Sequence, residues 1–187
     1  MRGKRISTRS ITETALLSAL ISVTAMISIP FPIPFTLQLF GVYFALFYLG
    51  AARGALAILI YVVIGAVGLP VFSGFTGGVG RLFDATGGFI LGFLLLSAVY
   101  LLVERMLGSS RLARLLAVIL SLVAFYALGS LWYAFVYNGG EGYFSALAVT
   151  VLPFVIPDLM KILLASAVAS RLRNIFYKKS SKKQKND

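Results

Sequence analysis

The chain has 187 residues, of which 59% are hydrophobic and 12% charged, and this composition excludes a water-soluble domain, whose core could not bury so much apolar surface. The absence of His and Cys excludes thiol chemistry, zinc sites built on those residues, and acid–base catalysis by imidazole. The net charge of +11 does not indicate nucleic-acid binding, because the basic residues lie in tails and short loops beside the apolar runs.

Apolar runs of roughly 15 to 25 residues, bounded by Gly, Pro or charge, predict an all-α membrane protein, a compact bundle of six transmembrane helices. A transmembrane barrel is not expected, because the runs show no strand-like alternation. The expected helices span residues 12–29, 37–51, 54–69, 88–106, 112–137 and 145–173. They form a single membrane domain over 1–187, whose last residues, 174–187, make a basic tail expected to be disordered and cytoplasmic.

The first expected helix contains the sequence ALLSA, in which Ala15 and Ala19 lie one turn apart. Small residues at this spacing let another helix approach closely. Gly88 and Gly92 form a second such pair in the fourth expected helix. In a compact bundle, packing within the chain is the first explanation for both pairs, and docking of a partner helix is the alternative.

The basic residues indicate the topology. All of the 17 Lys and Arg residues except Arg81 and Lys161 lie at helix ends that six spans place on one side of the membrane. The positive-inside rule assigns that side, with both termini, to the cytoplasm. We therefore expect a multi-pass protein of a prokaryotic cell (inner) membrane, in contact with the lipid bilayer.

The three outward connections, PFPIPF, PVFSGFTGGVGRLFDATGG and NGGEGY, are rich in Gly, Pro and aromatic residues. Irregular backbone at membrane depth persists only where protein or a water-filled cavity satisfies it. The sequence therefore predicts a cavity open to the outside that these segments line or cover, with plain extracellular loops as the alternative. Its candidate polar residues are Thr36, Gln38, Arg81, Trp132, Tyr137 and Asn138.

The last expected helix contains PDLMK, in which Asp158 and Lys161 share a helix face. About 15 Å of helix separates Lys161 from Arg171, which places Lys161 near the membrane midplane. A charged group there costs roughly 2.5–3.5 kcal/mol on a lone helix. The two groups indicate either a structural pair that neutralises itself or a polar ligand site, and Pro153 and Pro157 are expected to kink this helix beside them.

Such a site suits a small amphiphile with a carboxylate, an apolar middle and polar N–H and C=O groups. The chain has no phosphate-binding loop of the GxxxxGK[ST] type, so it does not hydrolyse ATP by that route. The sequence therefore favours a membrane binding protein that either lets its ligand pass or is driven by a partner. A lipid-modifying enzyme that uses Asp158 and Lys161 as acid and base, and a scaffold with structural charges, are the rival interpretations.

The segments PIPFTLQ, GLPVFSGFTGGVGRLFDATGGFILGF and PFVIPDLMKILLA together resemble the BioY family, the biotin-binding S components of energy-coupling-factor (ECF) vitamin transporters. The similarity extends over nearly the whole chain. It implies high-affinity capture of biotin from the outside, without a further cofactor and without catalysis. It also implies partnership with a transmembrane T component and two cytoplasmic ATPase subunits.

The resemblance carries over to particular residues. Ala15 and Ala19 match an AxxxA surface that docks on the T component, and Asp158 and Lys161 match an acid and a base that contact biotin. The Gly-rich segment matches a loop that covers the ligand. The matching glycines are Gly74, Gly77, Gly78 and Gly80. Members commonly read GPTGG where this chain reads DATGG, which leaves open the local turn and any ion pair between Asp84 and Arg81.

Biotin's ureido ring offers two N–H donors and one C=O acceptor, and a carboxylate can accept the N–H groups. We assign this role to Asp158. The valerate carboxylate needs a cation, and we assign it to Arg81. Lys161 remains open between steadying Asp158 and binding either end of biotin. The same fold binding another small carboxylated vitamin is the alternative.

Overall fold

The computed structural model describes residues 7–30, 33–137, 140 and 142–183, with side chains described as far as Ile175. In chain order the α-helices are α1 (Thr8–Met26), α2 (Gln38–Leu49), α3 (Ala51–Val67), α4 (Gly87–Leu107), α5 (Arg111–Trp132), α6 (Tyr143–Thr150) and α7 (Val155–Lys183). Two short strands, β1 (Ser28–Ile29) and β2 (Phe35–Thr36), pair antiparallel between α1 and α2. The chain is nevertheless mostly helical, and the strands amount to two paired residues each.

Local signals explain several helix ends. Ser7 caps α1, since its side chain accepts a hydrogen bond from the Ser10 N–H at 3.2 Å, and α1 therefore begins earlier than expected from the apolar run. Ser110 caps α5 in the same way through the Ala113 N–H. At the C-terminal end of α3, Gly68 adopts φ +119°, a conformation that ends a helix and that L side chains rarely adopt.

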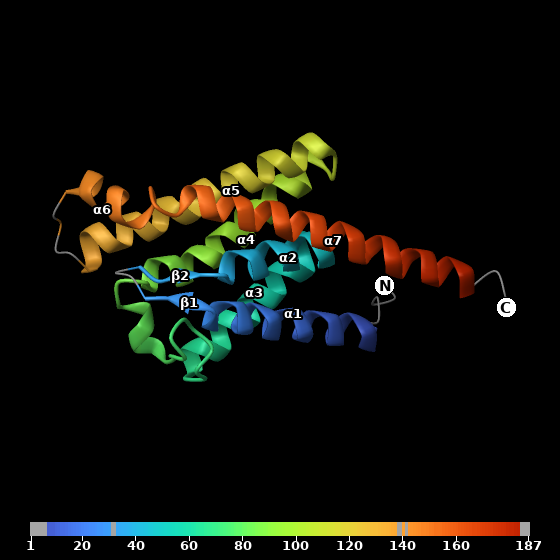
Figure 1. Ribbon diagram of the computed structural model, residues 1–187, viewed down its shortest axis with the longest axis horizontal. Coiled ribbons are helices and arrows are strands. Elements are labelled where there is room, and N and C mark those ends of the chain that lie inside the picture. Colours follow the sequence, from blue (N-terminus) through green and yellow to red (C-terminus); the bar gives the residue numbers. More distant parts are fainter. Residues whose placement is uncertain (1–6, 31–32, 138–139, 141, 184–187) are drawn as a thin grey trace, which may run out of the picture.

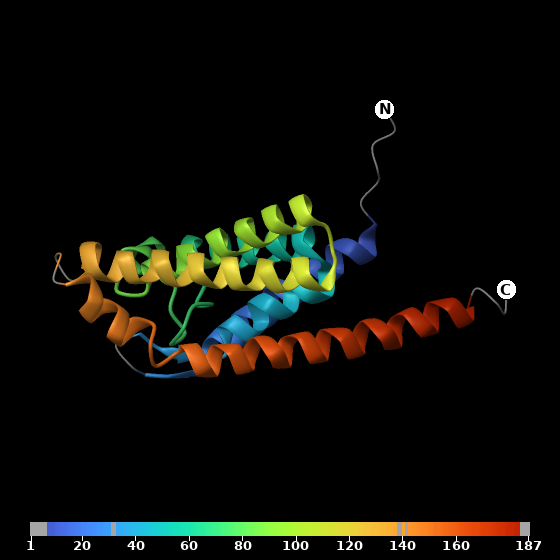
Figure 2. The same ribbon diagram turned by 90° about the horizontal axis from the view of Figure 1, so that it is seen from above.

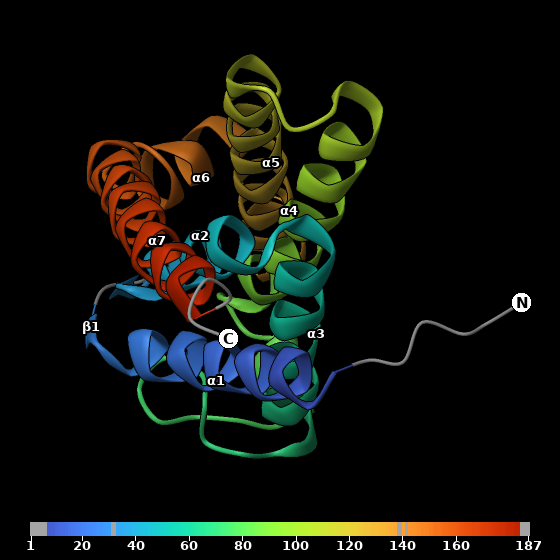
Figure 3. The same cartoon turned by 90° about the vertical axis from the view of Figure 1, so that its right-hand side faces the viewer.

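The helices form a bundle whose long members run roughly side by side (Figure 1, Figure 3). The most extensive packing is between α4 and α5, where a side chain at Gly88 would collide with Trp132 and one at Gly92 would crowd Phe125. This confirms internal packing as the use of the Gly88 and Gly92 pair. The other side of the bundle is built around α2, which packs against α1, α3 and α7.

Many large apolar side chains remain exposed, as expected of a protein that faces lipid. Within the described chain, α4 and the span Arg111–Tyr137 are long and apolar enough to cross a membrane, and the bent pair α6 and α7 adds a third candidate. The helices α2 and α3 are apolar but shorter. The architecture is therefore mostly helical with two to three clear apolar spans.

The expected single helix over 145–173 is wrong, because the structure divides it. Helix α6 ends at Thr150, α7 begins at Val155, and the two are bent by 49°. Pro153 lies in the break, while Pro157 lies in the first turn of α7, where a missing N–H costs little. The described chain thus has seven α-helices rather than six.

Helix α7 also continues to Lys183, beyond its expected end at 173. Residues 174–183 are therefore helical where a disordered tail was expected, and 184–187 lie outside the described residues. After the last residue of α5, Trp132, the chain continues in a π-helical turn, Tyr133–Tyr137. The two together match the helix expected over 112–137.

The irregular connections gather at one end of the bundle. The β1–β2 pair, the Gly-rich segment with its short 3₁₀ turn η1 (Val79–Leu82), and α6 all lie at the left of Figure 1, whereas the start of α1 and the end of α7 lie at the right. Gly74 and Gly78 adopt φ +72° and +96°, which lets the segment fold back over the bundle. This arrangement confirms that segments far apart in sequence fold together.

Candidate ligand-binding site

A cavity lies beneath these connections, lined from β2, α2, α3, the Gly-rich segment, α4, α5, α6 and α7. The space between its walls, counted together with the solvent at its open mouth, is about 660 Å³. Its walls combine aromatic side chains with a few polar and charged groups, so a ligand with both kinds of surface is indicated.

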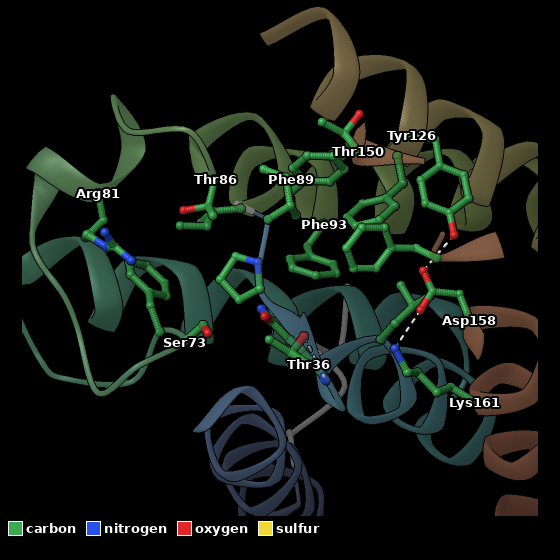
Figure 4. A pocket seen from close by; sticks show the side chains of 18 of the residues that line it. Thr36, Ser73, Arg81, Thr86, Phe89, Phe93, Tyr126, Thr150, Asp158 and Lys161 are labelled. Atoms are coloured by element: carbon green, nitrogen blue, oxygen red, sulfur yellow. Dashed lines mark hydrogen bonds and ion pairs between the residues drawn. The ribbon is translucent and has the colours of Figure 1, made fainter. Parts of the chain in front are cut away.

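One end of the cavity holds the acid and base of α7. Asp158 and Lys161 are 5% and 8% exposed, so both lie inside the protein rather than facing lipid. The Lys161 Nζ donates to Asp158 Oδ1 at 2.7 Å, and the Tyr126 hydroxyl of α5 donates to Asp158 Oδ2 at 2.6 Å. Figure 4 shows the three groups converging on the cavity.

Asp158 is thus held from two sides yet keeps acceptor capacity. Each of its oxygens accepts one hydrogen bond from the protein, and a carboxylate oxygen has lone pairs for a second. The Lys161 ammonium also lies 4.2 Å above the centre of the Phe35 ring, a favourable cation–π geometry. The carboxylate can therefore accept ligand N–H groups without releasing Lys161.

The middle of the cavity is aromatic. Phe93 and Phe89 of α4 pack on Phe125 of α5, with ring centroids 4.8 and 5.4 Å apart. Phe154, which also lines the cavity, stacks on Phe35 of β2 with ring centroids 5.6 Å apart, and this contact joins β2 to the turn before α7. These rings form an apolar passage between the charged ends.

Arg81 lies at the other end of the cavity, on η1 of the Gly-rich segment (Figure 4). It forms an ion pair with Asp84, which answers the question that DATGG left open. Asp84 also accepts the Ala85 N–H at 2.7 Å through its second oxygen. In the part of the chain that the structure describes, the buried Nε of Arg81 has no hydrogen-bond partner, so one donor remains for an anion.

A family model described as the BioY family matches residues 1–178. The chain belongs to the BioY family. It is 38% identical over 139 residues to the "Probable biotin transporter BioY" of Pyrococcus horikoshii, covering 74% of this chain and 79% of that one. It is 39% identical over 141 residues to the "Biotin transporter BioY" of Thermotoga maritima, covering 75% and 80%.

A solved structure, the S-component for biotin from an ECF-type ABC transporter, superposes on this BioY chain with a TM-score of 0.81. The match covers 93% of this chain and 95% of that one, at 23% sequence identity. Another, the S component of a bacterial ECF transporter, matches with a TM-score of 0.60 over 90% and 97%, at 16% identity. At these identities the likeness shows a shared fold.

In this BioY chain, five of the predicted site residues line the cavity: Thr36, Gln38, Arg81, Asp158 and Lys161. The Gln38 amide nitrogen donates to the Tyr61 hydroxyl at 2.8 Å, which orients its carbonyl oxygen. The Thr36 hydroxyl lies 3.4 Å from the Gln38 N–H at the start of α2. Segments separated by more than a hundred residues thus meet at one site.

The other predicted residues lie outside the lining. Trp132 donates its indole N–H to the Asp84 carbonyl at 3.2 Å and so ties the Gly-rich segment to α5. Gly77 lies so close to the Leu69 backbone that a side chain would collide, and Gly78 has the positive φ given above. Tyr137 is exposed in the π-helical turn, and Asn138 lies outside the described residues. Trp132, Gly77 and Gly78 therefore shape the Gly-rich segment beside the cavity without lining it.

Sequence reasoning missed Tyr126 and the aromatic residues of the cavity. Tyr126 lies in the interior of an apolar helix, away from the membrane interfaces where tyrosines gather. A buried tyrosine hydroxyl needs a hydrogen-bond partner, so its position was the available signal. The phenylalanines carried no such signal, because their positions in the apolar helices α4 and α5 do not show which of them face a cavity.

Proposed function

We propose that this BioY protein captures biotin from the outside and serves as the substrate-specific subunit of an ATP-driven ECF transporter. Its curated relatives are named as biotin transporters, which supports uptake rather than catalysis. The observation that carries the proposal is the buried Asp158–Lys161 pair, which lines a cavity with an open mouth. A pair that served only structure would gain little from an adjoining cavity.

Biotin matches the order of groups along the cavity. Its ureido ring fits the end with Asp158, which accepts N–H groups, and Lys161 beside it can donate to the ureido C=O. Its thioether ring and valerate chain fit the aromatic passage. Its carboxylate then lies at Arg81, whose guanidinium is suited to a planar anion.

The likeness to S components of ECF transporters supports the partners and the topology. We place six spans in a prokaryotic cell (inner) membrane with both termini cytoplasmic, since the basic helix ends lie away from the cavity. Ala15 and Ala19 are exposed on α1, whereas Thr14 and Ser18 of its other face are buried. That small-residue face is free for a T component, which two ATPase subunits would drive.

Charge removal at Arg81 tests the orientation of biotin. We expect Arg81→Gln to weaken biotin about ten- to a hundredfold, since a hydrogen bond to a charged group contributes about 1.5–3 kcal/mol. Biotin amide, which lacks the carboxylate, should lose far less affinity. Isothermal titration of both ligands measures the difference, with Arg105→Gln at the other end of α4 as the control. Equal losses for both ligands would remove Arg81 from the carboxylate end.

Titration of the purified full chain with biotin tests the function itself. We expect tight binding of one biotin per chain and an unchanged ligand mass after incubation. Competing carboxylated vitamins should not displace it. Displacement by one of them would assign the same fold to that vitamin, and chemical turnover of biotin or of lipid would restore the enzyme interpretation.

A further inference from the structure

A second cleft lies at the end of the bundle away from the biotin site, between α5 and α7. Helix α7 packs along α2, and it diverges from α5 toward its C-terminal end (Figure 1, Figure 2). The space between the cleft walls is about 1510 Å³ including its open side, more than twice that of the biotin site. Residues of α2 and α4 also line it, and the exposed apolar side chains of Leu115, Leu159 and Leu163 indicate a surface that faces lipid.

This cleft, here called the α5–α7 groove, is apolar along most of its length. Its walls carry Leu115, Val118, Ile119, Leu159, Ile162 and Leu163. About 21 Å of helix separates Leu159 from Arg173 at the groove's end, and one leaflet of the hydrocarbon core is about 15 Å thick. The groove therefore extends over the depth of one leaflet, which an acyl chain also spans.

The end of the groove that lies farthest from the biotin site is positively charged. Arg111 and Arg114 of α5 and Arg173 of α7 line it, against the single carboxylate of Glu104. Glu104 accepts the Ala51 N–H at 3.2 Å, and Arg173 donates to the Phe47 carbonyl at 3.2 Å. Among the described residues, neither arginine of α5 forms an ion pair. The charge at this end is therefore left for an anion.

We propose that the α5–α7 groove binds an anionic phospholipid, with its phosphate at Arg111, Arg114 and Arg173 and one acyl chain along the apolar wall. Basic pockets between membrane helices bind anionic headgroups on the side where lysines and arginines gather. Arginine binds phosphate oxygens through two parallel N–H groups. Ser166 and Ser170 share the face of α7 with Arg173 and offer hydroxyls to the glycerol region.

A free phosphate would use the arginines but not the apolar wall, whereas a neutral lipid would use the wall but not the arginines. Only a molecule with both parts uses the whole groove. A helix of another protein would need a polar face to match three arginines beside an apolar one. The combination of charge and length therefore favours an anionic lipid.

Native mass spectrometry of the full chain tests this proposal. The delipidated protein is offered equimolar phosphatidylglycerol and phosphatidylcholine with the same acyl chains. We expect phosphatidylglycerol adducts to be favoured at least about fivefold, since each arginine near an anionic headgroup contributes an effect of that order. Glycerol 3-phosphate and inorganic phosphate, at the same concentration, should not displace the lipid.

Two variants separate the parts of the groove. Arg111→Gln with Arg114→Gln should remove the preference between the two lipids, whereas Arg105→Gln, an exposed α4 residue outside the lining, should keep it. Ser166→Phe fills the groove and should remove both lipid adducts. Its neighbour Ala167, exposed but not in the lining, supplies the control Ala167→Phe. Unchanged biotin binding verifies that each variant is folded.

Three results would overturn the proposal. The first is equal retention of the two lipids by the unmodified chain. The second is displacement by glycerol 3-phosphate or phosphate as effectively as by phosphatidylglycerol, which would make the groove a phosphate site. The third is a protein dimer without lipid adducts that disappears in Ser166→Phe, which would make the groove a contact between two copies of the chain.

Discussion

Replacing Asp158 with Asn is expected to weaken biotin binding about ten- to a hundredfold. The carboxylate accepts from Lys161 and Tyr126, and we assign its remaining acceptor capacity to the ureido N–H groups. An amide of the same shape offers one neutral oxygen, and a hydrogen bond to a charged group contributes about 1.5–3 kcal/mol. Isothermal titration of the purified variant measures the loss.

The same substitution leaves the Lys161 ammonium buried without its counter-charge. Breaking a buried ion pair costs about 3–5 kcal/mol of stability, so thermal unfolding should occur at a lower temperature. A second variant, Asp158→Asn with Lys161→Met, removes the unpaired charge and should recover much of this stability. Its biotin affinity should remain low, because the acceptor is still missing.

The pair of variants separates the two interpretations of PDLMK. If the ion pair only neutralised itself, the double variant would be stable and would bind biotin like the unmodified chain. An affinity of Asp158→Asn within about twofold of the original would likewise remove the ureido assignment. Glu13→Gln is the matched control, since Glu13 pairs with Arg9 and Arg53 on the surface, outside the cavity.

A bulky side chain on the outer face of α1 is expected to abolish energised uptake and to spare biotin binding. Ala15→Trp or Ala19→Trp would hold a T-component helix away from α1, and small residues at this spacing act through close approach. Overpacking costs about 1–3 kcal/mol, which corresponds to roughly a five- to 140-fold loss of the docked complex. Uptake of labelled biotin by cells that express the whole transporter measures the effect.

Biotin titration of the same purified variants shows that the cavity is intact. Ala167→Trp, an exposed small residue of α7, is the control for a bulky residue on a membrane-facing helix. Unchanged uptake by both α1 variants would count against docking through this face. Loss of binding together with uptake would show that the substitutions disturb the bundle instead.

Part of the site could be read from the sequence because its signals are local. An acid and a base three positions apart in an apolar run share a helix face whatever the fold, and neither is stable against lipid. Arg81 was identifiable for a similar reason, as a rare cation in a Gly-rich segment. The structure places all three at one cavity, at its two ends.

Other features could not be predicted from the sequence, because they depend on contacts between distant segments. Trp132 was predicted at the ligand, and in the structure it lies outside the cavity lining and donates to the Asp84 carbonyl of the Gly-rich segment. Pro153 and Pro157 were expected to kink one helix. Instead the chain forms two helices, α6 and α7, whose axes are bent by 49° at the break between them. A proline shows where a backbone donor is missing, but packing decides whether the helix bends or ends there.

Local patterns were enough to predict the membrane class, the separation of basic helix ends from the Gly-rich connections, the AxxxA spacing in the first helix, and an acid and a base on one face of the last helix. These follow from hydropathy, charge and helical spacing, which act within a few turns of chain. Three features emerge only from the packing of distant helices: Tyr126 donates to Asp158, the rings of Phe89, Phe93 and Phe125 line the cavity together, and α5 and α7 leave a groove between them. Every apolar helix has several faces of similar hydrophobicity, and the fit of whole helices to one another selects which face packs inward.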